Sequence, residues 1–232
     1  MIIASPVGPG TGFDTIATIT AKSSAGLRAA GVDGCAIRYG SDLGLPERDV
    51  LLGEGRTVVL VQHVERPGWN ATATDGDLHG QEAVVWATRL EYPASAHIAL
   101  DMEGLANAGQ AVMAYVRAWA ARVKAAGWRV CVYVGYCAGL GVAQLLELAQ
   151  DGTVDVLWSD YGPRVAPAGV GFVMKQHPQE VVAGVEIDRD TCYGQDAQGR
   201  QLVGMALVDV TADTDPAPDP HFDPDVTITP VG

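Results

Sequence analysis

The chain has 232 residues, of which 48% are hydrophobic and 19% are charged, so it carries enough apolar material for a sizeable core. Fifteen lysines and arginines stand against 28 aspartates and glutamates. The resulting formal charge of −13 argues against partners such as nucleic acid or an anionic membrane surface. No run approaches the roughly 20 apolar residues of a membrane span, and the first residues lack the pattern of a secretory signal. We therefore expect neither membrane insertion nor a signal peptide.

Strand-like and helix-like segments alternate through the first two thirds of the chain. The predicted strands cover residues 12–14, 35–39, 57–62, 97–103 and 130–134. Five helices are predicted between and after them. The first ends near Gly31, the second runs from Pro46 to Gly53, the third covers 80–92, the fourth ends at Gly127, and the fifth covers 142–149. The helix that ends at Gly127 has the clearest signal, because Val112, Val116, Trp119 and Val123 form one apolar stripe.

The last third of the chain has strands without helices. Apolar runs at 154–158, 172–176 and 181–188 predict three strands, and the prolines and short spacers between them leave no room for a crossover helix. Five strand–helix units followed by three bare strands predict an α/β fold, a (β/α)8-type barrel with its helices reduced in the last third.

The length favours one domain, since single barrels often reach this size. We expect residues 1–210 to form the barrel with a C-terminal hairpin that turns around Asp196–Arg200. Residues 211–232 are expected to be an acidic, proline-rich tail, and the residues after about Asp213 are expected to be dispensable for folding, because their composition offers little apolar area.

Histidines and cysteines do not predict a metal or cofactor site. The four cysteines form no CxxC pair, and Cys35 and Cys131 lie in apolar strands where a buried thiol is expected. The five histidines lack metal-ligand spacing. His63 and His177 fall at predicted strand ends, where we expect structural histidines, with a hydrogen bond to a sugar as the alternative.

Two carboxylates occur together at the end of the fourth predicted strand. Alternation along 97–103 sends Ile98 and Leu100 to one face and Asp101 and Glu103 to the other. The apolar face suits the helix layer, so the two acids are expected to point into the barrel at the end where such barrels carry active sites. Two acids that share a partly buried site repel, so we expect a raised pKa for Glu103.

Further acids are predicted at the same rim. Asp14 ends the first predicted strand and Asp188 ends the last, and these strands are neighbours in a closed barrel. Each acid alone could instead cap a helix or pair with arginine, but four of them at matching strand ends favour a catalytic cleft.

The sequence resembles the glycoside-hydrolase-like barrels related to the family 25 lysozymes, the Chalaropsis-type muramidases. The segments that carry the resemblance are Gly12-Phe13-Asp14, Ala30-Gly31, Arg38-Tyr39, Ala99-Leu100-Asp101-Met102-Glu103, Val132-Tyr133-Val134-Gly135-Tyr136, Leu157-Trp158, Gln176 and Val185-Glu186-Ile187-Asp188. The resemblance covers about 12–190 and implies cleavage of the β-1,4 bond between N-acetylmuramic acid (MurNAc) and N-acetylglucosamine (GlcNAc) in peptidoglycan.

The resemblance also implies roles for individual residues. Glu103 would be the general acid, and Asp101 the partner carboxylate, either as nucleophile or as stabiliser of a substrate-assisted intermediate. Asp14, Asp188 and Gln176 would bind the sugar. Trp158 and Tyr161 are further candidates, for sugar stacking.

One departure from the lysozymes leaves alternatives open. They usually carry aromatic residues at the end of the third strand, where this chain has Val61-Gln62-His63-Val64. The first alternative is an active enzyme, for example a phage endolysin. The second is a catalytically inactive glycan-binding barrel, and the third is a structural barrel such as a component of a phage particle.

Overall fold

A computed structural model describes residues 1–135 and 138–208, except for the side chains of residues 65 and 66. The strands are β1 (Ile2–Pro6), β2 (Gly10–Asp14), β3 (Ala36–Tyr39), β4 (Val58–Trp69), β5 (His97–Leu105), β6 (Arg129–Val134), β7 (Val156–Ser159), β8 (Met174–Val182), β9 (Val185–Cys192) and β10 (Val203–Leu207). The helices are α1 (Ala21–Ala29), α2 (Leu45–Gly53), α3 (Ala73–Arg89), α4 (Gln110–Ala125) and α5 (Val142–Gln150). The expected tail at 211–232 lies outside the described residues.

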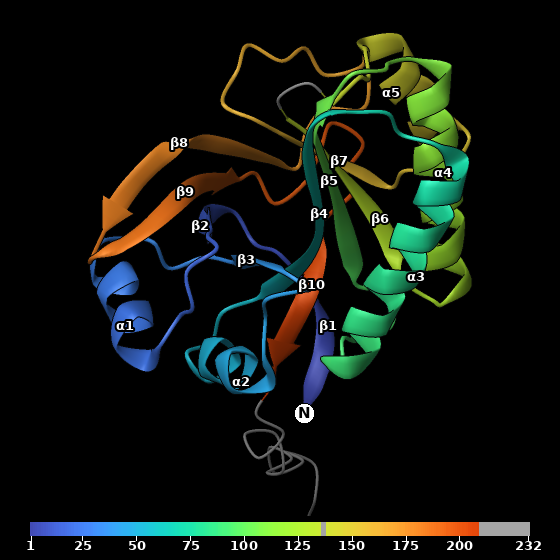
Figure 1. Cartoon of the computed structure of the whole chain (residues 1–232). Helices are drawn as coiled ribbons and strands as arrows, with labels where there is room; N and C mark the ends of the chain where they lie inside the picture. Colours follow the sequence, from blue (N-terminus) through green and yellow to red (C-terminus); the bar gives the residue numbers. More distant parts are fainter. Residues whose placement is uncertain (136–137, 209–232) are drawn as a thin grey trace, which may run out of the picture.

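Strands β2 to β9 form a closed eight-stranded barrel. Each strand from β2 to β7 pairs with the next in parallel, and β9 closes the barrel by pairing antiparallel with both β8 and β2. One helix follows each of the first five barrel strands, and none lies between β7, β8 and β9. The predicted barrel of five βα units and three bare strands is therefore confirmed. Helices α3, α4 and α5 cover one side, and the long β8–β9 ribbon forms the opposite side (Figure 1).

Strand β9 runs against its two neighbours. The turn between β8 and β9 places Ala183 at φ 51° and Gly184 at φ 78°, the left-handed pair typical of a two-residue hairpin. The strand predicted at 181–188 is therefore divided: its first two residues end β8, the next two form the turn, and residues 185–188 begin β9. As a result, β9 enters the barrel from the rim at which the parallel strands end.

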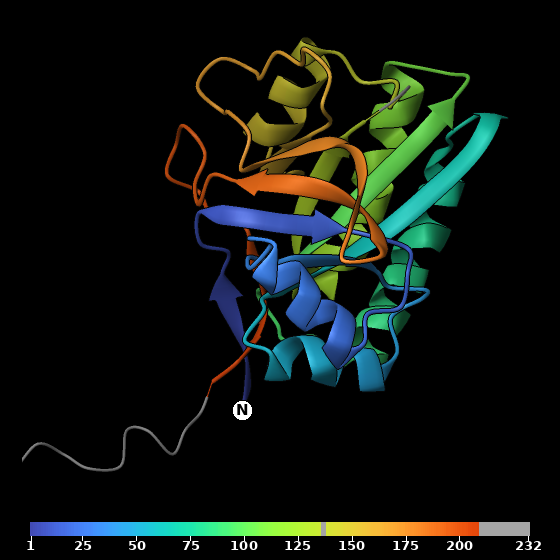
Figure 2. The same ribbon diagram turned by 90° about the vertical axis from the view of Figure 1, so that its left-hand side faces the viewer.

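The two strands nearest the ends of the described chain pair with each other. Strand β1, which the sequence did not predict, lies antiparallel to β10 (Figure 2), with Ile2 opposite Leu207, and β10 also pairs with β4. The predicted C-terminal hairpin is wrong in its pairing. Its turn exists, since Asp196 N–H donates to the carbonyl of Arg200, but β10 pairs with β1 and β4. Pairing across some 200 residues leaves no local signal in the sequence.

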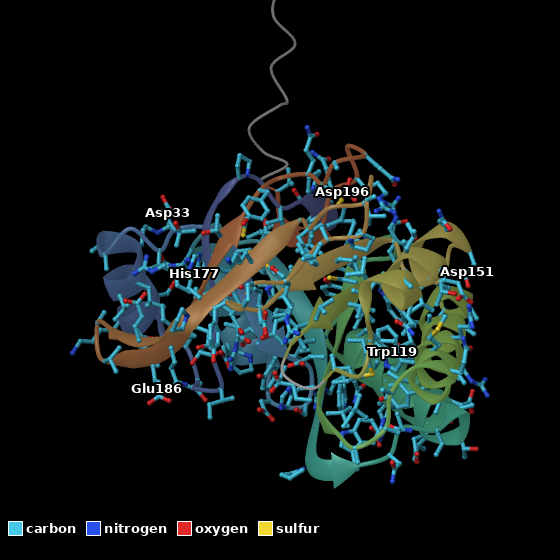
Figure 3. The ribbon with its side chains drawn as sticks, turned by 90° about the horizontal axis from the view of Figure 1, so that it is seen from above. Asp33, Trp119, Asp151, His177, Glu186 and Asp196 are labelled. Carbon is cyan, nitrogen blue, oxygen red and sulfur yellow. The ribbon has the colours of Figure 1, made fainter. Side chains whose placement is uncertain are left out.

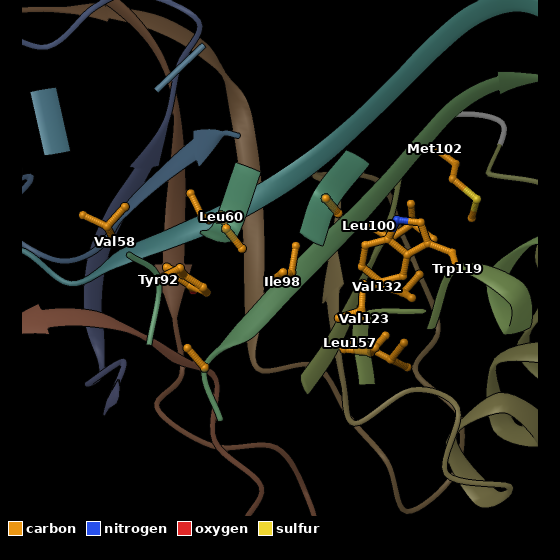
Figure 4. Close-up of a cluster of buried hydrophobic side chains, with 14 of the residues drawn as sticks. Val58, Leu60, Tyr92, Ile98, Leu100, Met102, Trp119, Val123, Val132 and Leu157 are labelled. Atoms are coloured by element: carbon orange, nitrogen blue, oxygen red, sulfur yellow. The ribbon is translucent and has the colours of Figure 1, made fainter. Parts of the chain in front are cut away.

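Alternation along the strands separates two apolar layers. Ile98, Leu100 and Met102 face the helices and pack in one cluster with Trp119 and Val132 (Figure 4). Inward residues such as Val61, Ala99 and Cys131 fill the barrel interior. The barrel is thus a packed core, and space for a ligand remains only at its ends.

Helices α3 and α4 pack closely because two glycines on α3 leave room for the α4 backbone. A Cβ on Gly76 would overlap the carbonyl of Tyr115, and one on Gly80 would lie 2.9 Å from the carbonyl of Trp119. The same glycines weaken the helix signal, which explains why the predicted helix began at residue 80 whereas α3 begins at Ala73, with Thr72 as its N-cap. In the described part of the chain, no helix is long and apolar enough to cross a membrane.

Candidate active site

The carboxylates of β5 point into the barrel mouth as predicted. Leu100 and Met102 belong to the helix-side cluster and Ala99 to the interior cluster, so Asp101 and Glu103 share the inward face. Both line a cavity of about 420 Å³ at the end where β5 and its parallel neighbours finish. Asp101 is 4% exposed and Glu103 is half-buried, so the pair spans the depth of the cavity.

The rest of the cavity wall comes from five other strands and loops. Its other lining residues are Tyr39, Tyr133, Asp160, Tyr161, Gln176, Pro178, Gln179 and Asp188. Tyr161 is 62% exposed at the cavity edge, which leaves its ring accessible to a sugar. A second cavity of about 410 Å³ lies at the opposite end of the barrel, beside His97, Arg129 and Asp155. It contains no pair of carboxylates, so the rim cavity is the candidate site.

Asp14 and Asp188 meet at this rim on paired strands. They are directly opposite each other in the β2–β9 register, and the side-chain amide of Gln176 lies 3.5 Å from an oxygen of each. The prediction that the two acids converge is therefore confirmed, but the reason given for Asp188 was wrong. Asp188 reaches the rim because β9 enters the barrel there, not because it ends a parallel strand. Both acids border a smaller cavity of about 130 Å³ that shares Tyr39 and Asp188 with the main one.

The site favours the neutral form of Asp14. Burial, followed by the nearby carboxylates of Asp101 and Asp188, raises its pKa to about 8, although Arg38 and His63 oppose the shift. Burial, followed by the neighbouring Glu186, also raises the pKa of Asp188 (Figure 3 places Glu186 on the β8–β9 side). At neutral pH, Asp14 therefore carries a proton, which reduces the repulsion among the rim acids.

A fifth acid, Asp190, lies one layer below the rim and was missed in the sequence. It is fully buried, and Trp158 Nε1–H donates to its Oδ1 over 3.0 Å. Burial holds the pKa of Asp190 well above its usual range. Continuing the alternation of Glu186 and Asp188 would have found it, but a buried acid in a barrel interior contradicts the expectation of apolar filling.

Trp158 is placed for support of the site, not for sugar stacking. Its indole is 1% exposed, packs on Tyr133 with ring centroids 4.4 Å apart, and does not line the cavity. Tyr133 in turn donates its hydroxyl to Gln176 Oε1 over 2.5 Å. Trp158 thereby packs beneath Tyr133 and supports the hydrogen bond between Tyr133 and Gln176, which both line the cavity.

Two tyrosines line the cavity as neutral phenols. Burial and the surrounding carboxylates raise the pKa of both Tyr39 and Tyr133, so both remain phenols at any physiological pH. Gly135 allows Glu103 to approach the wall, because a Cβ there would lie 2.7 Å from Glu103 Oε1. The loop after β7 is tied down by Arg164, which pairs with Asp160 over 2.7 Å and donates to the carbonyl of Gly135.

The two rim histidines differ in their contacts. His63 Nδ1 lies 2.6 Å from Asp101 Oδ2, and its ring stacks on Tyr39 with centroids 4.7 Å apart and planes within 3°. His177 faces away from the cavity and contacts Thr191 Oγ1 through Nε2 over 2.8 Å, as expected for a structural histidine. Within the described residues, no group of three or more histidine, cysteine or acidic side chains could hold a metal ion.

A closed βα barrel with a carboxylate pair over a rim cavity defines a glycoside-hydrolase-like barrel. The chain belongs to the family described as the Rv2525c-like, glycoside hydrolase-like domain, which matches residues 20–200. This membership confirms the resemblance stated from the sequence. No curated protein matches the chain.

Solved structures share the fold at low sequence identity. An uncharacterized B. stearothermophilus protein is 18% identical with a TM-score of 0.64, and the match covers 79% of this chain and 95% of that one. The modular autolysin LytC from Streptococcus pneumoniae is 12% identical with a TM-score of 0.53, over 79% of this chain and 46% of LytC. The Clostridium perfringens spore cortex lytic enzyme SleM is 13% identical with a TM-score of 0.51, over 81% of this chain and 68% of SleM.

Proposed function

We propose that this protein is a peptidoglycan-cleaving glycosidase of the lysozyme or muramidase type, which hydrolyses β-1,4 bonds between MurNAc and GlcNAc. The observation that carries the proposal is the placement of Asp101 and Glu103 side by side on the inward face of β5, over a cavity of about 420 Å³. Family membership supports glycosidase chemistry. LytC, which shares the fold, has also been solved with a synthetic peptidoglycan ligand, and this supports the choice of substrate.

Glu103 and Asp101 have different roles in the proposed hydrolysis. Glu103, half-buried at the cavity wall, protonates the glycosidic oxygen as the bond to the anomeric carbon breaks. Asp101, held by His63, stays ionised and stabilises the positive charge that develops on the sugar, either directly or through the N-acetyl group of the substrate. Water then adds to the anomeric carbon, and its proton returns to Glu103.

The remaining rim residues bind the sugar. Gln176 and protonated Asp14 present hydrogen-bonding groups beside Asp188, and the exposed ring of Tyr161 offers a stacking surface. Tyr39 adds a phenol hydroxyl on the neighbouring wall, and the Tyr133 hydroxyl, which donates to Gln176, can still accept a hydrogen bond there. These residues supply the polar contacts that a hydroxyl-rich ligand requires.

Turbidity of a suspension of purified peptidoglycan tests the proposal. The wild-type protein should clear the suspension, Glu103→Gln should abolish clearing, and Asp101→Asn should reduce it at least 100-fold, since a single transition-state charge contact contributes about 3 kcal/mol. Glu91→Gln, at an exposed position after α3, is the matched control and should clear normally.

Two outcomes would contradict the proposal. Full clearing by Glu103→Gln would rule out its role as the acid. A wild-type protein that binds peptidoglycan from several bacteria without clearing any of it would establish the inactive glycan-binding or structural barrel instead. A phage endolysin is the setting that we propose for the activity, and host lysis on co-expression with a membrane-pore protein tests that setting.

A further inference from the structure

The end of β4 carries an interaction that the two-carboxylate scheme does not use. In the parallel β4–β5 register His63 lies directly beside Asp101. Its Nδ1 approaches Asp101 Oδ2 to 2.6 Å, slightly shorter than the roughly 2.7–2.9 Å of charge-assisted N–H···O hydrogen bonds. The imidazole is 22% exposed and the carboxylate 5%, so the contact is largely shielded from water.

The imidazole is held in place from its other side. The ring of Tyr39 lies parallel to it, with planes within 3° and centroids 4.7 Å apart. Tyr39 is itself half-buried in the cavity wall. Because the stack fixes the plane of the imidazole, it also fixes the direction in which Nδ1–H points.

The hydrogen bonds of the two deep rim acids are unequal. Asp101 Oδ2 has His63 Nδ1 2.6 Å away, and this nitrogen is the donor whenever the carboxylate is ionised. Among the described residues, Asp14 Oδ1 has no hydrogen-bond partner, and Oδ2 has only the amide of Gln176 at 3.5 Å. A carboxylate with a strong donor retains its charge more readily than one without, so this geometry favours a proton on Asp14 over one on Asp101.

We propose that His63 is a positioning residue for Asp101: its Nδ1–H keeps the carboxylate ionised and orients it toward the cavity, with Tyr39 as the platform that holds the ring. The effect of His63 on catalysis rests on the proposed glycosidase function, whereas its effect on the charge and orientation of the Asp101 carboxylate does not. Among the described residues, the titratable groups around Asp101 include Asp14, Tyr39, Glu103, Tyr133, Asp160 and Asp188, and all of these remain unchanged in the variants below.

Two substitutions of His63 distinguish the effect of its Nδ1–H donor from the effect of its ring. His63→Phe keeps a flat ring against Tyr39 and removes the donor. His63→Asn removes the ring but can place its Nδ2–H₂ where Nδ1 lies. His177→Phe is the matched control, because His177 is a half-buried histidine on β8 that bonds to Thr191 instead of a rim acid.

Carbon-13 NMR of the carboxyl group of Asp101, followed across pH, tests the effect on the charge directly. We expect the resonance to titrate about 1 to 2 pH units higher in His63→Phe than in the wild type, and to return most of the way in His63→Asn. His177→Phe should match the wild type. Identical titration of Asp101 in His63→Phe and in the wild type would overturn the proposal, as would a His63→Asn variant that titrates like His63→Phe.

Kinetics on purified peptidoglycan test the catalytic part. We expect kcat to fall about 10- to 100-fold in His63→Phe with KM changed less than about twofold, and to recover in His63→Asn. An unchanged kcat in His63→Phe would contradict a role in positioning. If the wild-type protein hydrolyses no peptidoglycan, the proposed function fails, and the titration of Asp101 still decides whether His63 controls its charge.

Discussion

Asp14→Asn should make the protein more stable, and the gain should grow with pH. Burial and the neighbouring acids raise the pKa of Asp14 from its ordinary value of 3.8 to about 8. Between these two values the folded protein holds a proton that the unfolded chain has released, so the free energy of unfolding falls as pH rises. The wild type thus keeps the full contribution below about pH 4 and loses it through pH 8.

The size of the effect follows from the shift. Each pKa unit corresponds to about 1.4 kcal/mol, so a shift from 3.8 to about 8 destabilises the folded protein by about 6 kcal/mol once Asp14 is ionised. Asparagine has nearly the same shape and never ionises. The difference in free energy of unfolding between Asp14→Asn and the wild type should therefore be about 1–2 kcal/mol larger at pH 5 than below pH 4, and should rise by about 4 kcal/mol more by pH 9.

Urea unfolding of both proteins at each pH from 5 to 9 measures this difference. Asp42→Asn, at an exposed aspartate, is the control and should track the wild type at every pH. A difference between Asp14→Asn and the wild type that stays constant, or that shrinks as pH rises, would refute the assignment of a proton to Asp14.

Three further predictions concern the scaffold. Gly12→Ala would place a Cβ 2.6 Å from Cys35 Sγ, so it should lower stability by about 1–3 kcal/mol in thermal unfolding, whereas Gly53→Ala, with no atom within 4 Å, should be neutral or slightly stabilising. Trp119→Ala, at a fully buried position, should lose about 3–5 kcal/mol in urea unfolding, and a loss below 1 kcal/mol would contradict its place in the core. Deleting residues 211–232 should leave Tm nearly unchanged, and a large drop would mean that the tail docks on the barrel.

The barrel was predictable because each parallel strand carries its own signal. Apolar runs such as 57–62 mark strands buried on both faces, and the stripe that contains Trp119 marks a helix, so the order of elements follows from local patterns. What escaped prediction depends on distant contacts. Strand β1 is stabilised by β10, almost the whole chain away, and the start of α3 at Ala73 is stabilised by α4 packing against Gly76 and Gly80.

The candidate site was also predictable where it depends on local patterns, and not where it depends on contacts between distant strands. Alternation in Asp101-Met102-Glu103 places both acids on one face, and the structure agrees. The direction of β9 could not be inferred from alternation, which is the same for parallel and antiparallel strands. Sequence also did not show that His63 would contact Asp101, since that contact depends on the register between β4 and β5.

The most direct test of the central claim identifies the bond that is cleaved. Purified peptidoglycan is incubated with the wild-type protein or with Glu103→Gln, reduced with borohydride, hydrolysed, and examined by mass spectrometry for the sugar at each new reducing end. We predict reduced muramic acid in the wild-type digest and none above background with Glu103→Gln. Reduced glucosamine in the wild-type digest, or equal release of reduced muramic acid by Glu103→Gln, would contradict the assignment of this barrel as a muramidase that uses Glu103 as its acid.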